Sequence, residues 1–132
     1  MRPSHILIVD NDPAAAMVTQ HGLQRLFVSD AEVEIAASPL QAWARCQDTP
    51  VDLVVVDPST ENSPANALVK DLHAFYPEIP VVVLTAYDTP RLRSQMRSLG
   101  VRHYLAKPVE LQDLGISARV ALSEHLASAG NV

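Results

Sequence analysis

The sequence predicts an α/β fold in which helices cover both faces of a five-stranded parallel sheet. Short aliphatic runs alternate along the chain with longer stretches of helical spacing, and four of the five runs are rich in Val, Ile or Leu without polar alternation. Strands that are covered on both faces have this composition. Because connections between consecutive parallel strands are right-handed, five strand–helix units in a row favour a doubly wound sheet.

The predicted strands are short and apolar, and they cover residues 5–10, 32–37, 51–57, 80–86 and 101–107. The second strand differs from the others because it carries Glu32 and Glu34. Charged side chains are tolerated at the edge of a sheet, where they reach water. We therefore place this strand at an edge.

Two helices have clear start signals. Asp12 can cap a helix that has Pro13 at its first position, and Thr89 with Pro90 repeats this arrangement. Gly100 predicts the end of the second of these helices. Helical spacing predicts three more helices, near residues 39–47, 65–76 and 110–127.

Apolar residues at helical spacing predict which face of each helix is buried. The predicted sets, in chain order, are Ala15, Val18, Gly22 and Leu26; Ala42, Trp43 and Cys46; Leu68, Val69, Leu72 and Phe75; Leu92, Met96 and Leu99; and Leu111, Leu114, Val120 and Leu122. Gly115 is expected to weaken the last helix by roughly 1 kcal/mol relative to alanine.

Composition sets limits on the class of protein. The length of 132 residues predicts one domain, which we assign to residues 1–127, with a short flexible tail at 128–132. A net charge of −5 argues against nucleic-acid binding by this domain. No apolar run approaches the roughly 18 residues of a membrane span. Cys46 is the only cysteine, which fits a reducing compartment. We expect a cytoplasmic protein without a membrane partner.

Polar residues follow four of the predicted strands. Asp10-Asn11-Asp12 follows the first strand and Asp57 ends the third, while Thr85 and Lys107 lie near the ends of the fourth and fifth. Ligands bind at the carboxyl ends of strands in open α/β sheets, so we expect these groups to converge. Two carboxylates, a hydroxyl and an ammonium group suit phosphoryl transfer to a carboxylate nucleophile with the help of Mg²⁺.

These features together resemble the receiver (phosphoacceptor) domain of two-component response regulators. The matching segments are "ILIVDND", "DLVVVD", the pair "TA" at 85–86 and "YLAKP" at 104–108, and the resemblance extends from about Ile6 to Leu126. Asp57 and Thr85 are 28 residues apart, and Thr85 and Lys107 are 22 apart, which is close to the spacing in that family. The resemblance implies a flavodoxin-like three-layer sandwich with strand order 2-1-3-4-5 and a cis Lys107–Pro108 bond.

The resemblance also implies a role for each residue at the strand ends. Asp57 would be the phosphoacceptor, Lys107 and Thr85 would contact the phosphoryl group, and Ala86 would leave room for it. Tyr104 would be a switch residue whose rotamer follows Thr85. The Mg²⁺ ligands would be Asp10, Asn11, Asp57 and the backbone carbonyl of Ser59.

The sequence departs from the family pattern at this site. Asn11 stands where a second acidic residue is usual, so we expect weak Mg²⁺ binding, because an amide brings no charge. The loop after the acceptor is also unusual. It has Pro58 directly after Asp57, Glu61 at a position that is usually proline, and Pro64-Ala65 in place of Asp-Gly.

By this resemblance, the chain would be a signalling switch and not an enzyme. A histidine kinase or histidine phosphotransfer protein would phosphorylate Asp57. The face formed by the fourth helix, fifth strand and fifth helix would act on an output domain or protein, or form a homodimer. This region carries four arginines, which are either a solvated face or a partner site: Arg91, Arg93, Arg97 and Arg102.

Two alternatives remain at this point. Asn11 and the altered loop also fit a degenerate receiver that acts as a phosphorylation-independent protein-binding module. The segment "VDND" superficially fits a phosphohydrolase of the haloacid-dehalogenase type, with Asp10 as nucleophile and Asp12 as acid/base. The chain is short for that class and lacks its cap insertion and late acidic pair. The five histidines show no ligand-like spacing.

Overall fold

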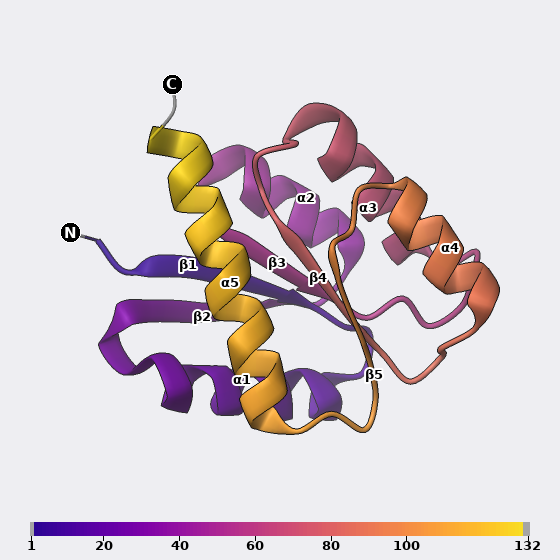
Figure 1. The fold of residues 1–132 in the computed structure, drawn as a ribbon, viewed down its shortest axis with the longest axis horizontal. Helices are drawn as coiled ribbons and strands as arrows, with labels where there is room; N and C mark the ends of the chain where they lie inside the picture. Colours follow the sequence, from indigo (N-terminus) through magenta and orange to yellow (C-terminus); the bar gives the residue numbers. More distant parts are fainter. Residues whose placement is uncertain (1, 131–132) are drawn as a thin grey trace.

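The structure is a computed structural model that describes residues 2–130, with side chains described to residue 127. Strands and helices alternate along the chain, apart from one short 3₁₀ turn, η1 (Figure 1). In chain order the elements are β1 (Ser4–Val9), α1 (Pro13–Phe27), η1 (Val28–Asp30), β2 (Ala31–Ala36), α2 (Pro39–Asp48), β3 (Leu53–Val56), α3 (Pro64–Phe75), β4 (Val81–Thr85), α4 (Pro90–Ser98), β5 (His103–Ala106) and α5 (Leu111–Gly130).

The five strands form one parallel sheet in the order β2-β1-β3-β4-β5. The predicted order is therefore confirmed, and the strand with Glu32 and Glu34 lies at an edge. Figure 1 shows α1 and α5 on one face of the sheet and α2, α3 and α4 on the other. The domain is thus the expected three-layer α/β sandwich.

Alternate residues of the central strands enter two separate cores. Leu7 and Val54 point to the core under α2, α3 and α4, whereas Ile6 and Leu53 point to the core under α1 and α5. All four side chains are fully buried. Both faces of these strands are apolar because both are covered, which is why the sequence shows no polar alternation there.

The predicted helix starts are confirmed by hydrogen bonds. The Asp12 carboxylate accepts from the backbone N–H groups of Ala14 and Ala15, at 3.0 and 3.3 Å. The Thr89 hydroxyl accepts from the N–H of Leu92 at 3.0 Å. The Asp12 side chain is therefore used as a helix cap, as expected of an aspartate before proline.

The predicted buried face of α1 is wrong by one position. The helix buries Ala16, Thr19, Leu23 and Phe27, while Val18 is 74% exposed. Three consecutive alanines, residues 14–16, open the apolar stripe, and they suit neighbouring faces equally. The rotation of the helix is instead decided by packing against the sheet. Thr19, which is also β-branched, takes the buried position that was predicted for Val18.

Three other predicted core residues lie at the surface. Phe75 is 69% exposed and packs edge-on against Trp43, with ring centroids 5.9 Å apart. Leu111 and Val120 are also exposed, because α5 buries a face formed by Leu114, Ala118, Ala121 and Leu122. The small alanines of this face let the helix lie close to the sheet, and alanine carries little hydrophobic signal in a sequence.

Gly115 does not interrupt α5, which is continuous from Leu111 to Gly130. A Cβ atom at Gly115 would lie 2.7 Å from Cδ1 of Leu26 on α1. Gly22 has the reciprocal position, because its Cβ would lie 2.6 Å from Cδ1 of Leu111. The two glycines therefore permit the close approach of α1 and α5.

Several smaller predictions concern the loops and the ends. Gly100 follows α4 with a φ of 84°, a conformation that favours glycine, and the Lys107–Pro108 bond is cis. The expected flexible tail, 128–132, falls partly on α5, and its last two residues lie outside the described part of the chain. Within the described residues, none of the helices has both the length and the apolar character needed to cross a membrane.

Candidate functional site

The polar residues predicted at the strand ends meet at the carboxyl edge of the sheet. Val9 pairs with Val56, so the residues that follow them, Asp10 and Asp57, are neighbours. The backbone N–H of Asp57 donates to the Val9 carbonyl oxygen at 3.0 Å. The backbone N–H of Lys107 donates to the Thr85 carbonyl oxygen at 2.8 Å. Both charged residues are thus held by an extension of the strand pairing.

Asp10, Asp57 and Lys107 form what we call the charged site. Lys107 Nζ donates to Asp57 Oδ2 at 2.8 Å and lies 3.6 Å from Asp10 Oδ2. The side chain of Asp10 is 5% exposed, whereas those of Asp57 and Lys107 are 16% and 25% exposed. The site therefore has one deeply buried carboxylate, and one that solvent and a reactant can reach.

The charges of this site are not balanced. Burial, followed by the nearby negative charge of Asp57, raises the pKa of Asp10, even though the N–H of Asp12 and the ammonium of Lys107 oppose the shift. Burial lowers the pKa of Lys107, but the hydrogen bond and charge of Asp57 and the interactions with Asp10 together outweigh this, so the pKa of Lys107 is raised overall. One ammonium group does not neutralise two carboxylates, so the charged site keeps an excess of negative charge. A bound cation would reduce this excess.

Asn11 and Ser59 lie at the rim of the charged site. Each is exposed, and each lies in the loop that follows one of the two carboxylates. An asparagine side chain and a backbone carbonyl offer neutral oxygen atoms, which together with carboxylates are the ligands that Mg²⁺ prefers. The described residues contain no cluster of three or more His, Cys, Asp or Glu suited to a metal. These oxygen donors suit a hard cation, to which the charged site would offer two carboxylates.

The hydroxyl of Thr85 bonds to two backbone groups near the charged site. It is fully buried, donates to the Pro58 carbonyl oxygen at 2.8 Å, and accepts from the N–H of Tyr87 at 3.0 Å. Thr85 therefore fastens the end of β4 to the loop after Asp57. Ala86 is exposed beside it and adds no side chain larger than a methyl group.

Tyr104 lies on β5, paired with Val83 of β4. Its hydroxyl donates to Asp88 Oδ1 at 2.9 Å, and the guanidinium of Arg93 lies over its ring, 4.5 Å from the centroid. The ring packs partly buried against the core under α4. Burial, followed by the bond to Asp88, raises the pKa of Tyr104 to about 12.

The unusual loop after Asp57, which Thr85 fastens to the end of β4, also contacts the start of α4. The hydroxyl of Thr89 donates to Glu61 Oε1 at 2.9 Å. The amide of Asn66 donates to the Glu61 carbonyl oxygen, and the hydroxyl of Ser63 donates to Asn66 Oδ1 at 3.2 Å. Glu61 thus links this loop to the helix that follows β4, a contact that the sequence did not reveal, because the two residues are 28 positions apart.

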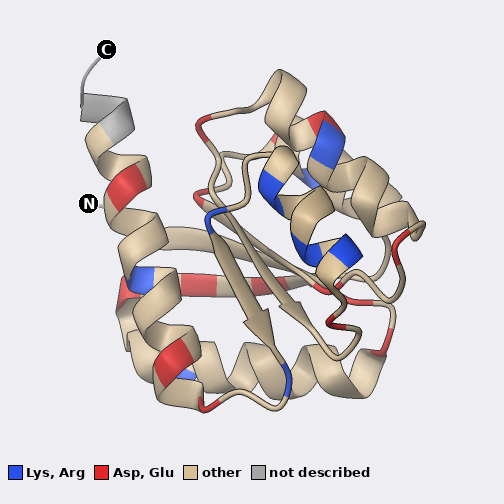
Figure 2. Ribbon diagram, turned by 45° about the vertical axis from the view of Figure 1, so that its right-hand side comes forward, with Lys and Arg blue, Asp and Glu red and all other residues tan. Residues whose placement is uncertain are grey.

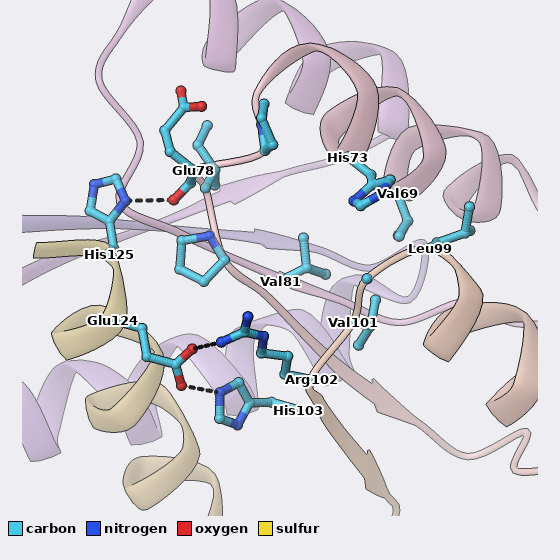
Figure 3. A pocket seen from close by; sticks show the side chains of 14 residues that line it. Val69, His73, Glu78, Val81, Leu99, Val101, Arg102, His103, Glu124 and His125 are labelled. Atoms are coloured by element: carbon cyan, nitrogen blue, oxygen red, sulfur yellow. Dashed lines mark hydrogen bonds and ion pairs between the residues drawn. The ribbon is translucent and has the colours of Figure 1, made fainter. Parts of the chain in front are cut away.

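Another group of charged residues lies at the opposite end of the sheet. Asp52 lies at the opposite end of the sheet, before β3, where it accepts from Arg2, from the N–H of His5 and from His125. A cavity of about 310 Å³ opens at the same end, beside His73, His103 and His125, three of its lining residues shown in Figure 3. His5 and His103 pair with glutamates and His125 bonds to the Glu78 carbonyl oxygen, and the described residues contain no histidine cluster suited to a metal.

Comparison with known proteins agrees with this geometry. The sequence model of the response regulator receiver domain matches residues 6–119, and the chain belongs to this family. Relatives include the transcriptional regulatory protein ZraR of Escherichia coli (strain K12), 29% identical over 118 residues, and the DNA-binding transcriptional regulator NtrC of Rhizobium meliloti (strain 1021), 32% identical over 125 residues. The alignments cover 89% and 94% of this chain, but only 26% and 25% of those proteins.

Solved structures show the same fold. A receiver domain protein (CheY-like) from Methanospirillum hungatei JF-1 has a TM-score of 0.85 at 25% identity, with 96% of this chain and 98% of that chain covered. The signal receiver domain of an HD domain-containing protein from Pseudomonas fluorescens Pf-5 has a TM-score of 0.85 at 24% identity, with 96% and 99% covered. Receiver domains are signalling modules of two-component systems, so the class of protein predicted from the sequence is confirmed.

Proposed function

We propose that this domain is a phosphorylation-dependent switch in which Asp57 accepts a phosphoryl group. The observation that carries the proposal is the contact between Lys107 Nζ and Asp57 Oδ2, beside the buried Asp10. It gives a nucleophilic carboxylate at a rigid strand end, with a fixed positive charge next to it. A carboxylate alone would repel an incoming phosphoryl group, and the ammonium group reduces that repulsion.

In the proposed reaction, a carboxylate oxygen of Asp57 forms a bond to the phosphorus of a phosphohistidine on the donor protein. The bond between phosphorus and the imidazole nitrogen breaks, and its electron pair stays on the nitrogen. Lys107 then pairs with the phosphoryl oxygens, and the Thr85 hydroxyl leaves Pro58 to donate to one of them. Bound Mg²⁺ would neutralise negative charge on the transferred group, held by Asp10, Asn11, Asp57 and the Ser59 carbonyl.

The partners follow from the family and from the surface. A histidine kinase or histidine phosphotransfer protein would supply the phosphoryl group, and the setting would be the cytoplasm. The face formed by α4, β5 and α5 would act on an output domain or protein, or on a second copy of the chain. Figure 2 shows basic residues along α4, a helix without any acidic residue. Since the chain spans about a quarter of the length of its two relatives, the output itself belongs to the proposal.

The alternative of a binding module that is never phosphorylated rests on Asn11 and the altered loop after Asp57. Titration with beryllofluoride, a phosphoryl analogue, distinguishes the two functions. We expect Mg²⁺-dependent shifts of the NMR signals of Thr85 and Tyr104 in the natural protein. The Asp57→Asn variant should show none of them. A folded natural protein that does not respond at any Mg²⁺ concentration would favour the binding module.

A further inference from the structure

Asp88, Arg93 and Tyr104 contact one another in a closed triangle beside the β4–α4 connection. Asp88 Oδ1 accepts from the Tyr104 hydroxyl, and Asp88 Oδ2 accepts from Arg93 Nη2, both at 2.9 Å. The third side is the Arg93 guanidinium over the Tyr104 ring, at 4.5 Å. Each residue thus contacts both of the others, and the Tyr104 side chain is held at its hydroxyl and at its ring face.

The three residues come from three parts of the molecule that the fold brings together. Asp88 lies three residues after Thr85, Arg93 lies in the first turns of α4, and Tyr104 lies on the edge strand β5. The Asp88 and Arg93 side chains are 33% and 46% exposed. Contacts at this exposure are screened by water, so they bias a conformation by a modest amount and do not lock it.

We infer that Asp88 and Arg93 are positioning residues that hold Tyr104 in its resting place, and that they thereby oppose the phosphorylated state. The inference rests on the proposed function and adds a regulation of it that belongs to this chain. The raised pKa of Tyr104 supports the geometry, because burial and the bond to Asp88 both favour the neutral phenol.

The triangle is connected to the charged site through Thr85. Movement of the Thr85 hydroxyl toward a phosphoryl group breaks its bonds to Pro58 and to the N–H of Tyr87. The β4–α4 connection, which carries Asp88, then loses the bond between its Tyr87 N–H and Thr85. Any movement of Tyr104 that accompanies this change must break its bond to Asp88 and its stacking with Arg93. Both contacts therefore stabilise the resting state and not the phosphorylated state. Their loss shifts the equilibrium toward the phosphorylated state.

The test compares beryllofluoride affinity in the presence of Mg²⁺ for the natural protein, Asp88→Ala, Tyr104→Phe and the double variant. We expect each single variant to bind about three- to tenfold more tightly, the scale of one exposed charged hydrogen bond. The double variant should bind no more tightly than the single ones, because both changes remove the same bond. Asp71→Ala, which removes an exposed aspartate of α3, is the matched control and should bind like the natural protein.

A second readout needs no phosphoryl analogue. In the resting protein the stacked ring should shift the NMR signals of the Arg93 side chain upfield, and Asp88→Ala should reduce this shift. If the natural protein and Asp88→Ala bind beryllofluoride equally and the Arg93 signals do not change, the inference is wrong although the proposed function stands. If none of the proteins binds the analogue while Asp88→Ala still moves the Arg93 signals, the proposed function fails and only the restraint on Tyr104 survives.

Discussion

The Thr85 hydroxyl donates a 2.8 Å hydrogen bond to the carbonyl oxygen of Pro58, the residue that follows Asp57. The two residues belong to different strand–loop connections, 27 positions apart in sequence. In the resting structure this bond occupies the hydroxyl that the proposed reaction requires at the phosphoryl group. The Thr85 hydroxyl therefore fastens the loop after Asp57 in the resting structure. The same hydroxyl must leave this loop when Thr85 responds to phosphorylation.

Thr85→Val should destabilise the fold, because it preserves shape but removes the hydroxyl. The Pro58 carbonyl would lose its partner in a buried contact, and the Tyr87 N–H would lose its partner in a partly buried one. We expect the free energy of unfolding in urea to fall by about 1–3 kcal/mol, the usual cost of a buried unsatisfied group. Thr85→Ser keeps the hydroxyl and should cost less. Equal losses in the two variants would mean that the hydroxyl does not fasten the loop.

Asn11→Asp should tighten Mg²⁺ binding. The natural charged site offers two carboxylates, and a third charge close to the ion should add about 1–2 kcal/mol, the scale of a screened charge pair several ångströms apart. Titration calorimetry at fixed ionic strength measures the difference. Equal affinities would show that Asn11 does not limit metal binding. In the resting structure Oδ1 of Asp12 accepts the two cap bonds of α1.

Asp10→Asn should stabilise the metal-free protein at neutral pH. The folded-state pKa of Asp10 is raised above 3.8, chiefly by burial, so the charged form is disfavoured in the fold. Stability linked to Asp10 is therefore fully present below pH 3.8 and is lost as the pH rises through the folded-state pKa. With EDTA at pH 7 we expect the melting temperature to rise by roughly 2–5 °C. This gain should vanish below pH 3.8. A variant less stable than the natural protein at pH 7 would contradict the prediction.

Asp52→Ala should have the opposite effect, since Asp52 holds the other end of the sheet together. Burial raises the pKa of Asp52, but the hydrogen bonds from the His5 N–H and from Arg2 outweigh it, so the pKa is lowered overall. Its contribution is present above pH 3.8 and is lost as the pH falls through the folded-state value. We expect a loss of about 2–4 kcal/mol at pH 7, because the variant leaves the buried His5 N–H without an acceptor.

Chemical denaturation at pH 7 and at pH 3 tests this prediction. The difference between Asp52→Ala and the natural protein should shrink at the lower pH, where the carboxyl group is being protonated. Asp48→Ala, at the end of α2, is a matched control that removes an aspartate for which the described contacts show no partner. If the control is destabilised as much as Asp52→Ala, loss of charge and not loss of the contacts around Asp52 explains the effect.

The sequence predicts the fold well where one physical signal dominates. Continuous apolar runs gave the strands, and Asp12-Pro13 and Thr89-Pro90 gave two helix starts that the structure confirms. The buried face of α1 could not be predicted, because Ala14, Ala15 and Ala16 suit several rotations of the helix. Gly115 was interpreted as a weak point of α5, since its contact with Leu26 depends on a helix that is distant in sequence.

The candidate site shows the same limit. The strand ends identify Asp10, Asp57, Thr85 and Lys107, because parallel strands bring their carboxyl ends to one edge. The direction of the Thr85 hydroxyl, the contact of Glu61 with Thr89 and the bond between Asp88 and Tyr104 all depend on the paths of loops. Side chains that meet across two loops leave no regular spacing in a sequence, so only the structure shows them.

Intact mass measurement after incubation with acetyl phosphate and Mg²⁺ tests the central claim most directly. The natural protein should gain the mass of one phosphoryl group, about 80 Da by the general chemistry of phosphoryl transfer to a carboxylate. The Asp57→Asn variant should gain none, and borohydride reduction followed by peptide mapping should place the modification at Asp57. A mass gain that persists without the Asp57 carboxylate, or label at Asp10 or Asp12, would contradict the assignment of Asp57 as the phosphoacceptor.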